Sequence, residues 1–223
     1  MKSESELKFL ELLRKPVKSK EEVAEKERWR NIFAGELKQE IMHLSKELIE
    51  AGCKYTDPWD LVNTKESYPE AIDILVKHAS MPYHDRNKEG IIRALSVKEA
   101  KGKANTVLIS EYNKIPKEKH NLRWVIGNAI CVIITTEDTD SVLSIVEDKE
   151  NGMSRDRFVL ALGRIRSDKV EDCLIKLLDD SEMVPYALQA LRKIKSKGEI
   201  ISLTNSSNDL IKKEAQKTLA KIE

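Results

Sequence analysis

The chain has 223 residues, a length that one large domain or two small ones can use to bury a core without disulfides or metals. Charged residues make up 35% of it and aromatic residues only 5%, which disfavours a sheet-rich fold and favours solvated helices. Lys plus Arg (39) nearly balance Asp plus Glu (38), so there is no overall positive field to hold a nucleic acid.

Nothing in the sequence directs the chain to a membrane or out of the cell. The first 15 residues, MKSESELKFLELLRK, are charged throughout and lack the apolar segment of a secretory signal. The longest apolar run, residues 129–134, is far shorter than the roughly 20 residues that span a bilayer. The cysteines are far apart and form no C-x-x-C pair, which favours reduced thiols in a cytoplasmic protein: Cys53, Cys131 and Cys173.

Helix starts are marked by four Ser-x-x-Glu patterns, at Ser3, Ser19, Ser67 and Ser96, because both side chains can bond free backbone amides there. After the second start, apolar residues recur every three or four positions up to residue 52, predicting one long amphipathic helix that Gly35 can bend: Trp29, Phe33, Leu37, Ile41, Leu44 and Leu48. We therefore expect residues 1–54 to form an N-terminal helical segment.

Residues 55–67 contain Asp57-Pro58-Trp59-Asp60, which breaks the periodicity and predicts a connector. From residue 68 to residue 223, helical segments of 10 to 17 residues alternate with turn signals. No segment shows the two-residue alternation of a half-buried strand. The sequence therefore predicts an all-α fold.

An internal repeat becomes visible when five helices are aligned on one apolar residue, at spacings of 35, 32, 29 and 28. The aligned residues are Leu95, Ile130, Leu162, Leu191 and Leu219. The residue before each is small: Ala94, Ala129, Ala161, Ala190 and Thr218. Three positions after the anchor, Lys98 alone departs from an apolar residue, the others being Ile133, Ile165, Ile194 and Ile222. Small residues flanked by apolar ones let neighbouring helices approach closely, and each hairpin can bury its apolar side only against its neighbours.

The repeat resembles those of a known protein family. The segment GRIRSDKVEDCLIKLLDDSEMVPYALQALRKI resembles the HEAT-like repeats of phycobiliprotein lyases. DRNKEGIIRAL, RWVIGNAI and RDRFVLALGRI resemble small bacterial HEAT-repeat proteins. The resemblance covers residues 68–223 and implies a right-handed α-α superhelix, a solenoid of about five hairpins whose second helices line the concave face. We expect residues 1–54, which lie outside the resemblance, to cap one end of this solenoid. It implies no chemistry by itself.

Seven residues before the anchor, four of five repeats carry a basic residue: Lys88, Arg123, Arg155 and Lys212, with Val184 as the exception. Two interpretations stay open. Each side chain can bond an acidic neighbour or the carbonyl end of the preceding helix and so tie repeat to repeat. Alternatively, the four form a stripe that meets an acidic partner.

A candidate binding face lies on the same helices. Arg86, Glu89 and Arg93 share one helix side, as do Asn121, Trp124 and Asn128 on the next. Large amphipathic and planar charged groups are typical anchors of protein interfaces. Glu89 with Arg93 also fits an ordinary surface pair, and Trp124 also fits a core position. We take the partner-binding residues to be Arg86, Glu89, Arg93, Arg123, Trp124, Asn128 and Arg155.

Patterns for catalysis are thin. The histidines at 43, 78, 84 and 120 are scattered, and none is followed by Glu as in HEAT-repeat hydroxylases that hold iron. There is no G-x-S-x-G, P-loop or G-x-G-x-x-G motif. Cys131 and Cys173 lie in apolar stretches that favour packing. The sequence therefore predicts no catalytic residues, no metal and no cofactor.

The expected function is a non-enzymatic, monomeric binding module whose concave face docks another protein. An inhibitor, such as an immunity protein covering a toxin's active site, is one version of it. The alternative is a DNA-binding protein resembling the alkylpurine DNA glycosylases, in which Trp124 and Asp156 with Arg123 and Arg155 would form the site. A chromophore lyase or chaperone is a further alternative that rests on the repeat type alone.

Overall fold

The computed structural model describes residues 2–194, 197–207 and 209–220. This part of the chain consists of helices joined by turns and contains no strand, which confirms the all-α class. The α-helices are α1 (Glu4–Arg14), α2 (Lys20–Glu40), α3 (Met42–Glu50), α4 (Pro58–Asn63), α5 (Pro69–Ala79), α6 (Asp85–Ala94), α7 (Asn105–Lys114), α8 (His120–Ile133), α9 (Thr139–Glu147), α10 (Asp156–Leu162), α11 (Asp168–Lys176), α12 (Val184–Ile194), α13 (Lys197–Leu203) and α14 (Asp209–Leu219). Short 3-10 turns include η1 (Lys98–Ala100), η3 (Lys149–Arg155) and η4 (Leu177–Asp179).

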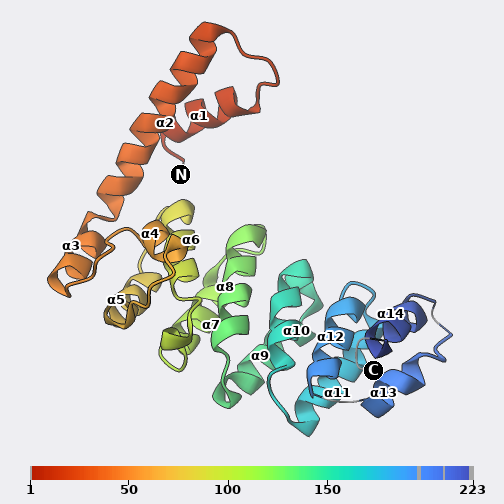
Figure 1. Ribbon diagram of the computed structural model, residues 1–223. Coiled ribbons are helices and arrows are strands. Elements are labelled where there is room, and N and C mark those ends of the chain that lie inside the picture. Colours follow the sequence, from red (N-terminus) through yellow and green to blue (C-terminus); the bar gives the residue numbers. More distant parts are fainter. Residues whose placement is uncertain (1, 195–196, 208, 221–223) are drawn as a thin grey trace.

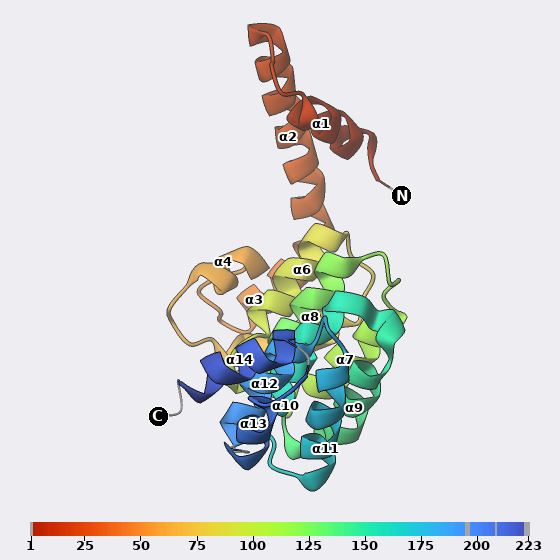
Figure 2. The ribbon, with the colours of Figure 1, turned by 90° about the vertical axis from the view of Figure 1, so that its right-hand side faces the viewer.

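From α3 onward, the helices alternate between two rows (Figure 1). In the first row, α4, α6, α8, α10, α12 and α14 pack on one another in that order. In the second row, α3, α5 and α7 are successive neighbours, as are α9 and α11. Figure 2 looks along the rows, so that their helices overlap while α1 and α2 stand away from them. Each hairpin therefore contributes one helix to each row.

The aligned alanines lie where the rows meet. Ala94, Ala129, Ala161 and Ala190 are completely buried, and so are the four anchor residues that follow them. In the last repeat, Thr218 and Leu219 are partly buried, while Ile222 lies outside the described residues. A core of buried side chains runs without a break from Leu44 to Ala215. This continuous apolar core holds the rows together, because burial of apolar surface is the main favourable contribution to folding.

Helices α1 and α2 form an arm that projects from the rows (Figure 1). They pack on each other, with the Phe9 and Phe33 rings 6.5 Å apart, yet α2 has no buried residue. The long helix predicted from residue 19 to residue 52 is interrupted at Ile41 (φ −89°, ψ 5°) and not at Gly35. The Asn87 amide donates to the Leu37 carbonyl at 2.9 Å, and a side chain that takes a helix carbonyl is a known cause of kinks.

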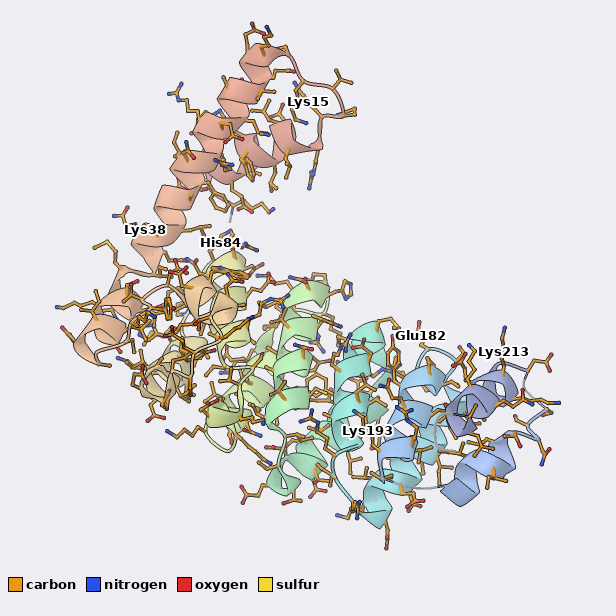
Figure 3. All side chains as sticks on the ribbon, in the orientation of Figure 1. Lys15, Lys38, His84, Glu182, Lys193 and Lys213 are labelled. Atoms are coloured by element: carbon orange, nitrogen blue, oxygen red, sulfur yellow. The ribbon has the colours of Figure 1, made fainter. Side chains whose placement is uncertain are left out.

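The base of the arm contacts α6 through His84 (Figure 3). The imidazole Nε2 lies 3.2 Å from a Glu6 carboxylate oxygen of α1, and the ring meets the Phe33 ring edge-on at 5.3 Å. The His84 backbone amide donates to Glu40 at 2.8 Å. One residue at the start of α6 thus contacts both helices of the arm.

Two of the four predicted helix starts are confirmed. The hydroxyl of Ser3 accepts from the Glu6 amide, and Ser19 forms a complete capping box with Glu22. The other two are wrong: α5 begins at Pro69 with no side-chain cap, and the Ser67 hydroxyl donates to Glu99 instead. Ser96 precedes only the turn η1. Proline at the first helical position needs no amide partner, which explains the start of α5.

The segment predicted as a connector contains α4, a member of the first row. Asp57 caps it by accepting from the Trp59 amide at 2.8 Å, and Pro58 takes the first helical position. Trp59 packs on α6 where Gly90 leaves room, since a Cβ there would lie 2.9 Å from the indole Nε1. Gly127 serves α8 in the same way, because a Cβ there would meet the Phe158 ring of α10 at 3.0 Å. Both glycines therefore allow close packing of neighbouring helices.

Gly163, at the end of α10, shows the tightest approach between helices. A Cβ at this residue would lie 2.8 Å from the Ala190 Cα and 3.1 Å from its carbonyl oxygen. We expect Gly163→Ala to lower the free energy of unfolding by about 1–3 kcal/mol, because backbone atoms of α12 would have to move. The matched substitution Gly35→Ala meets no atom within 4 Å and should leave stability unchanged or raise it by about 0.5–1 kcal/mol. Urea unfolding measures both, and equal losses would contradict this packing.

Candidate partner-binding face

Three of the four basic repeat positions, Lys88, Arg123 and Arg155, lie inside the molecule. Lys88 is buried, and its ammonium group donates to the carbonyl oxygens of Ala79 and Met81 at the end of α5. The same ammonium lies 2.9 Å from a carboxylate oxygen of Glu111, which belongs to α7 in the next hairpin. Lys88 therefore ties its own hairpin to the following one.

Arg123 makes the equivalent contacts one hairpin later. Its guanidinium is buried, donates to the carbonyls of Tyr112 (3.3 Å) and Ile115 (2.9 Å), and reaches the Asn151 side chain of η3. It also lies 3.9 Å from the centre of the Tyr112 ring. The carbonyls at the end of α7 have no partner within that helix, so this side chain satisfies them.

Arg155 repeats the pattern again and is only 1% exposed. It donates to the carbonyls of Gly152 (3.0 Å) and Val146 (3.2 Å) and pairs with Asp180 at 2.9 Å. Of the two interpretations of the basic positions, these contacts support the one in which they join hairpins. We therefore leave Arg123 and Arg155 out of the surface proposed below; Lys212, on α14, is exposed.

Two arginines of the first row instead stack on tryptophans. The Arg86 guanidinium lies 3.9 Å from the centre of the Trp59 ring, joining α6 to α4. The Arg157 guanidinium lies 4.7 Å from the centre of the Trp124 ring, joining α10 to α8. Arg86 is exposed and the other three side chains are partly exposed, so both stacks reach the surface. Such cation–π pairs hold the planar groups in place.

Glu89 joins α6 to α8. Its carboxylate accepts from Arg93 at 2.8 Å and from the Asn121 amide at 3.1 Å. The pair with Arg93 expected from the sequence is therefore present, and a contact to the next hairpin accompanies it. Both carboxylate oxygens of Glu89 therefore have a partner.

Arg93 and Asn128 line a groove of about 600 Å³ between the loop after α4, the end of α6 and α8. Its apolar wall comes from Leu61, Val62 and Val132. Lys65 and Lys98 add positive charge at the rim, while Glu66 and Glu99 are engaged by Lys54 and Ser67 respectively. The groove is large enough for one or two side chains of a partner.

We call the exposed set the Arg–Trp face: Trp59, Arg86, Glu89, Arg93, Trp124, Asn128 and Arg157. The sequence reasoning missed Trp59 and Arg157. Trp59 lies in the segment expected to be a connector. Arg157 occupies a position of its repeat that was not compared with the other repeats. The only available signal was Gly127, whose missing side chain makes room for Arg157 at a Cβ distance of 3.0 Å.

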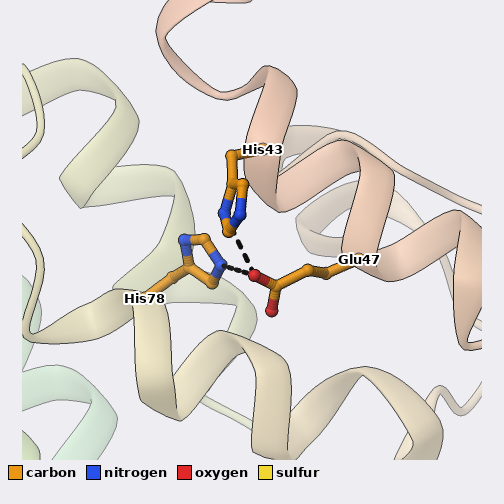
Figure 4. Close-up of side chains that lie close together, drawn as sticks. All are labelled: His43, Glu47 and His78. Carbon is orange, nitrogen blue, oxygen red and sulfur yellow. Dashed lines mark ion pairs between the residues drawn. The ribbon is translucent and has the colours of Figure 1, made fainter.

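Side chains that could act as acids, bases or nucleophiles are mostly buried or bonded to other residues. Burial raises the pKa of Asp156, which lies 3.7 Å from the Arg157 Nε and is 5% exposed. Burial also raises the pKa of the Cys173 thiol to about 11, which keeps it in the unreactive protonated form. One cluster can hold a cation: His43 and His78 lie 3.0 and 3.4 Å from the same Glu47 oxygen (Figure 4). In the sequence, this cluster is marked by a His and a Glu four residues apart on one helix.

None of the described helices combines the length and the apolar character needed to cross a membrane. Comparisons with protein-family models, with curated proteins and with solved structures gave no match to this chain.

Proposed function

We propose that the chain is a HEAT-like solenoid, a right-handed superhelix that serves as a binding module in the cytoplasm. The two rows of helices, the buried alanines between them and the repeated Lys88, Arg123 and Arg155 ties support this proposal. A stack whose members contact only their neighbours presents a long surface made of equivalent helices. Such a surface suits recognition of another macromolecule.

The Arg–Trp face is the surface that binds a partner protein. The observation that carries this step is the pair of guanidinium–indole stacks, Arg86 on Trp59 and Arg157 on Trp124. Tryptophan and arginine dominate the binding energy of protein interfaces, and here both are held in a fixed orientation before any partner arrives. The groove beside Arg93 and Asn128 receives a partner side chain.

The charge of the face indicates the chemistry of the partner. The Arg–Trp face carries three arginines, Arg86, Arg93 and Arg157, and one carboxylate, Glu89, which pairs with Arg93. A protein surface that carries carboxylates complements this arrangement, since planar guanidinium groups bind carboxylates through two parallel hydrogen bonds. An inhibitor that covers an acidic active-site rim is one version of this function.

The DNA-repair alternative has less support from the geometry. It requires Arg123 and Arg155 in an open channel and an accessible Asp156, whereas all three residues are at least 95% buried. Phosphate contacts need exposed cations, and both of these guanidinium groups are already bonded to backbone carbonyls.

Reversing two charges on the Arg–Trp face should abolish binding of the partner without unfolding the chain. We expect Arg86→Glu with Arg157→Glu to weaken binding at least ~30-fold, because two anchors are lost and two repelled charges are added. The matched control is Lys103→Glu with Lys169→Glu, which makes the same change of charge on exposed side chains near α7 and on α11, each paired with an exposed aspartate. The measurement is affinity capture followed by calorimetry with the purified partner. A partner that binds both double variants equally would remove this face from consideration.

A further inference from the structure

A second candidate site lies where α3 meets α5, apart from the Arg–Trp face. His43 and Glu47 are one turn apart on α3, and His78 lies near the end of α5 (Figure 4). The His43 Nδ1 is 3.0 Å from a Glu47 carboxylate oxygen, and the His78 Nε2 is 3.4 Å from the same oxygen. All three ligand atoms lie within 4.8 Å of one another.

These separations fit a tetrahedral cation. Zinc binds imidazole nitrogen and carboxylate oxygen at about 2.0–2.1 Å, so two ligand atoms of a tetrahedral site are about 3.3 Å apart. The two separations from the Glu47 oxygen, 3.0 and 3.4 Å, lie close to that value, and the two imidazole nitrogens lie within 4.8 Å of each other. Two imidazoles and one carboxylate also form a ligand set that binds divalent zinc in preference to magnesium or calcium. The cluster therefore matches zinc in both spacing and chemistry.

His78 provides an independent indication of a ligand. Its side chain is completely buried, and its Nε2 has no hydrogen-bond partner although it points at Glu47. The other ring nitrogen, Nδ1, is hydrogen-bonded to the Tyr83 hydroxyl. When Nδ1 donates its proton to that oxygen, the Nε2 lone pair is left free to bind a cation, which is how metal-binding histidines are oriented in proteins.

We propose that His43 Nδ1, a Glu47 carboxylate oxygen and His78 Nε2 bind a zinc ion that bridges α3 and α5. His43 is 70% exposed, so the fourth position faces solvent and takes a water molecule. The ion holds α3, the helix from which the arm projects, against the second row. The zinc site involves none of the residues of the Arg–Trp face, so the test of zinc binding is independent of the test of the proposed function.

Lys77 competes with the metal. Its ammonium group lies 2.7 Å from the Glu47 oxygen that both histidines approach. The side chain is 52% exposed, so it can turn into solvent when a cation takes its place. Removing this positive charge should therefore strengthen zinc binding, an effect that a cluster with a purely structural role would not produce.

The test is calorimetric titration of the purified full-length chain with zinc chloride. We expect one ion per chain, and binding at least ~10-fold weaker in His43→Ala and in Glu47→Gln, since loss of even an outer-shell contact has this effect. Lys77→Met should bind more tightly. His120→Ala is the matched control, because this residue is also an exposed histidine but lies at the start of α8. His43 is exposed, so its variant should retain the wild-type circular dichroism spectrum.

Cobalt provides a second readout. Cobalt(II) bound by two imidazoles and a carboxylate should give the visible absorption of a tetrahedral ion without a thiolate charge-transfer band. Loss of that absorption in His43→Ala is the supporting result. Absence of zinc binding, equal affinity in all four variants, or a thiolate band that disappears in Cys53→Ser would each overturn the proposal.

Discussion

Arg155→Ala should lower the free energy of unfolding by about 3–5 kcal/mol, the cost of breaking a buried ion pair by removing one partner. The wild-type guanidinium, 1% exposed, bonds the carbonyls of Gly152 and Val146 and pairs with Asp180. Without it, a largely buried carboxylate and two carbonyls lose their partner, and a cavity remains between η3 and α12. Chemical denaturation monitored by circular dichroism measures the loss.

The control for this substitution is Arg164→Ala. Arg164 lies just after the end of α10. It is exposed, and its guanidinium donates to the Val132 carbonyl at 3.1 Å. Surface substitutions of this kind usually change stability by less than about 0.5 kcal/mol. Equal losses for the two variants would mean that Arg155 is not a tie between hairpins.

Lys88→Met should also be strongly destabilising, by about 3 kcal/mol at neutral pH, because it leaves Glu111 buried with only the exposed Lys114 beside it. In the wild-type protein, burial opposes ionisation of Glu111, yet the hydrogen bonds from Lys88 and Lys114 hold the pKa of its carboxyl below the ordinary value of 4.5. Methionine keeps the apolar stem of the side chain and removes only the charge and the donors.

The pH dependence of this effect has a definite sign. A lowered pKa in the folded state adds stability that is present above pH 4.5 and is lost as pH falls through the folded value. In Lys88→Met, burial dominates and raises the pKa of Glu111, so that carboxyl favours folding only when protonated. The difference between the two proteins should therefore shrink from about pH 7 to about pH 4. A constant difference would show that only the carbonyl contacts of Lys88 matter.

The sequence predicted the helical class and the buried alanine positions because both depend on local periodicity. Around Ala94, Ala129, Ala161 and Ala190, apolar residues recur three or four positions apart, which is the spacing of one helix face, and all four alanines are completely buried. The break at Ile41 could not be predicted, because its cause is Asn87, 50 residues away from the carbonyl that it binds. Long-range hydrogen bonds of this kind leave no local pattern.

The candidate face was only partly predictable for the same reason. Arg86, Glu89, Arg93, Trp124 and Asn128 were identified from helical spacing, and the structure places all five on the first-row helices α6 and α8. Arg123 and Arg155 share that spacing but point at carbonyl groups, a difference of side-chain direction that spacing does not contain. Trp59 belongs to a six-residue helix, too short to show periodicity.

The alternation of rows has a consequence for how the chain forms during its own synthesis. Each helix of the first row contacts the next member two helices further along the chain, so a hairpin can pack as soon as its successor leaves the ribosome. The arm is different, because Glu6 meets His84 across 78 residues. Although the arm is synthesised before α6, α1 and α2 can make this contact only after α6 has emerged from the ribosome.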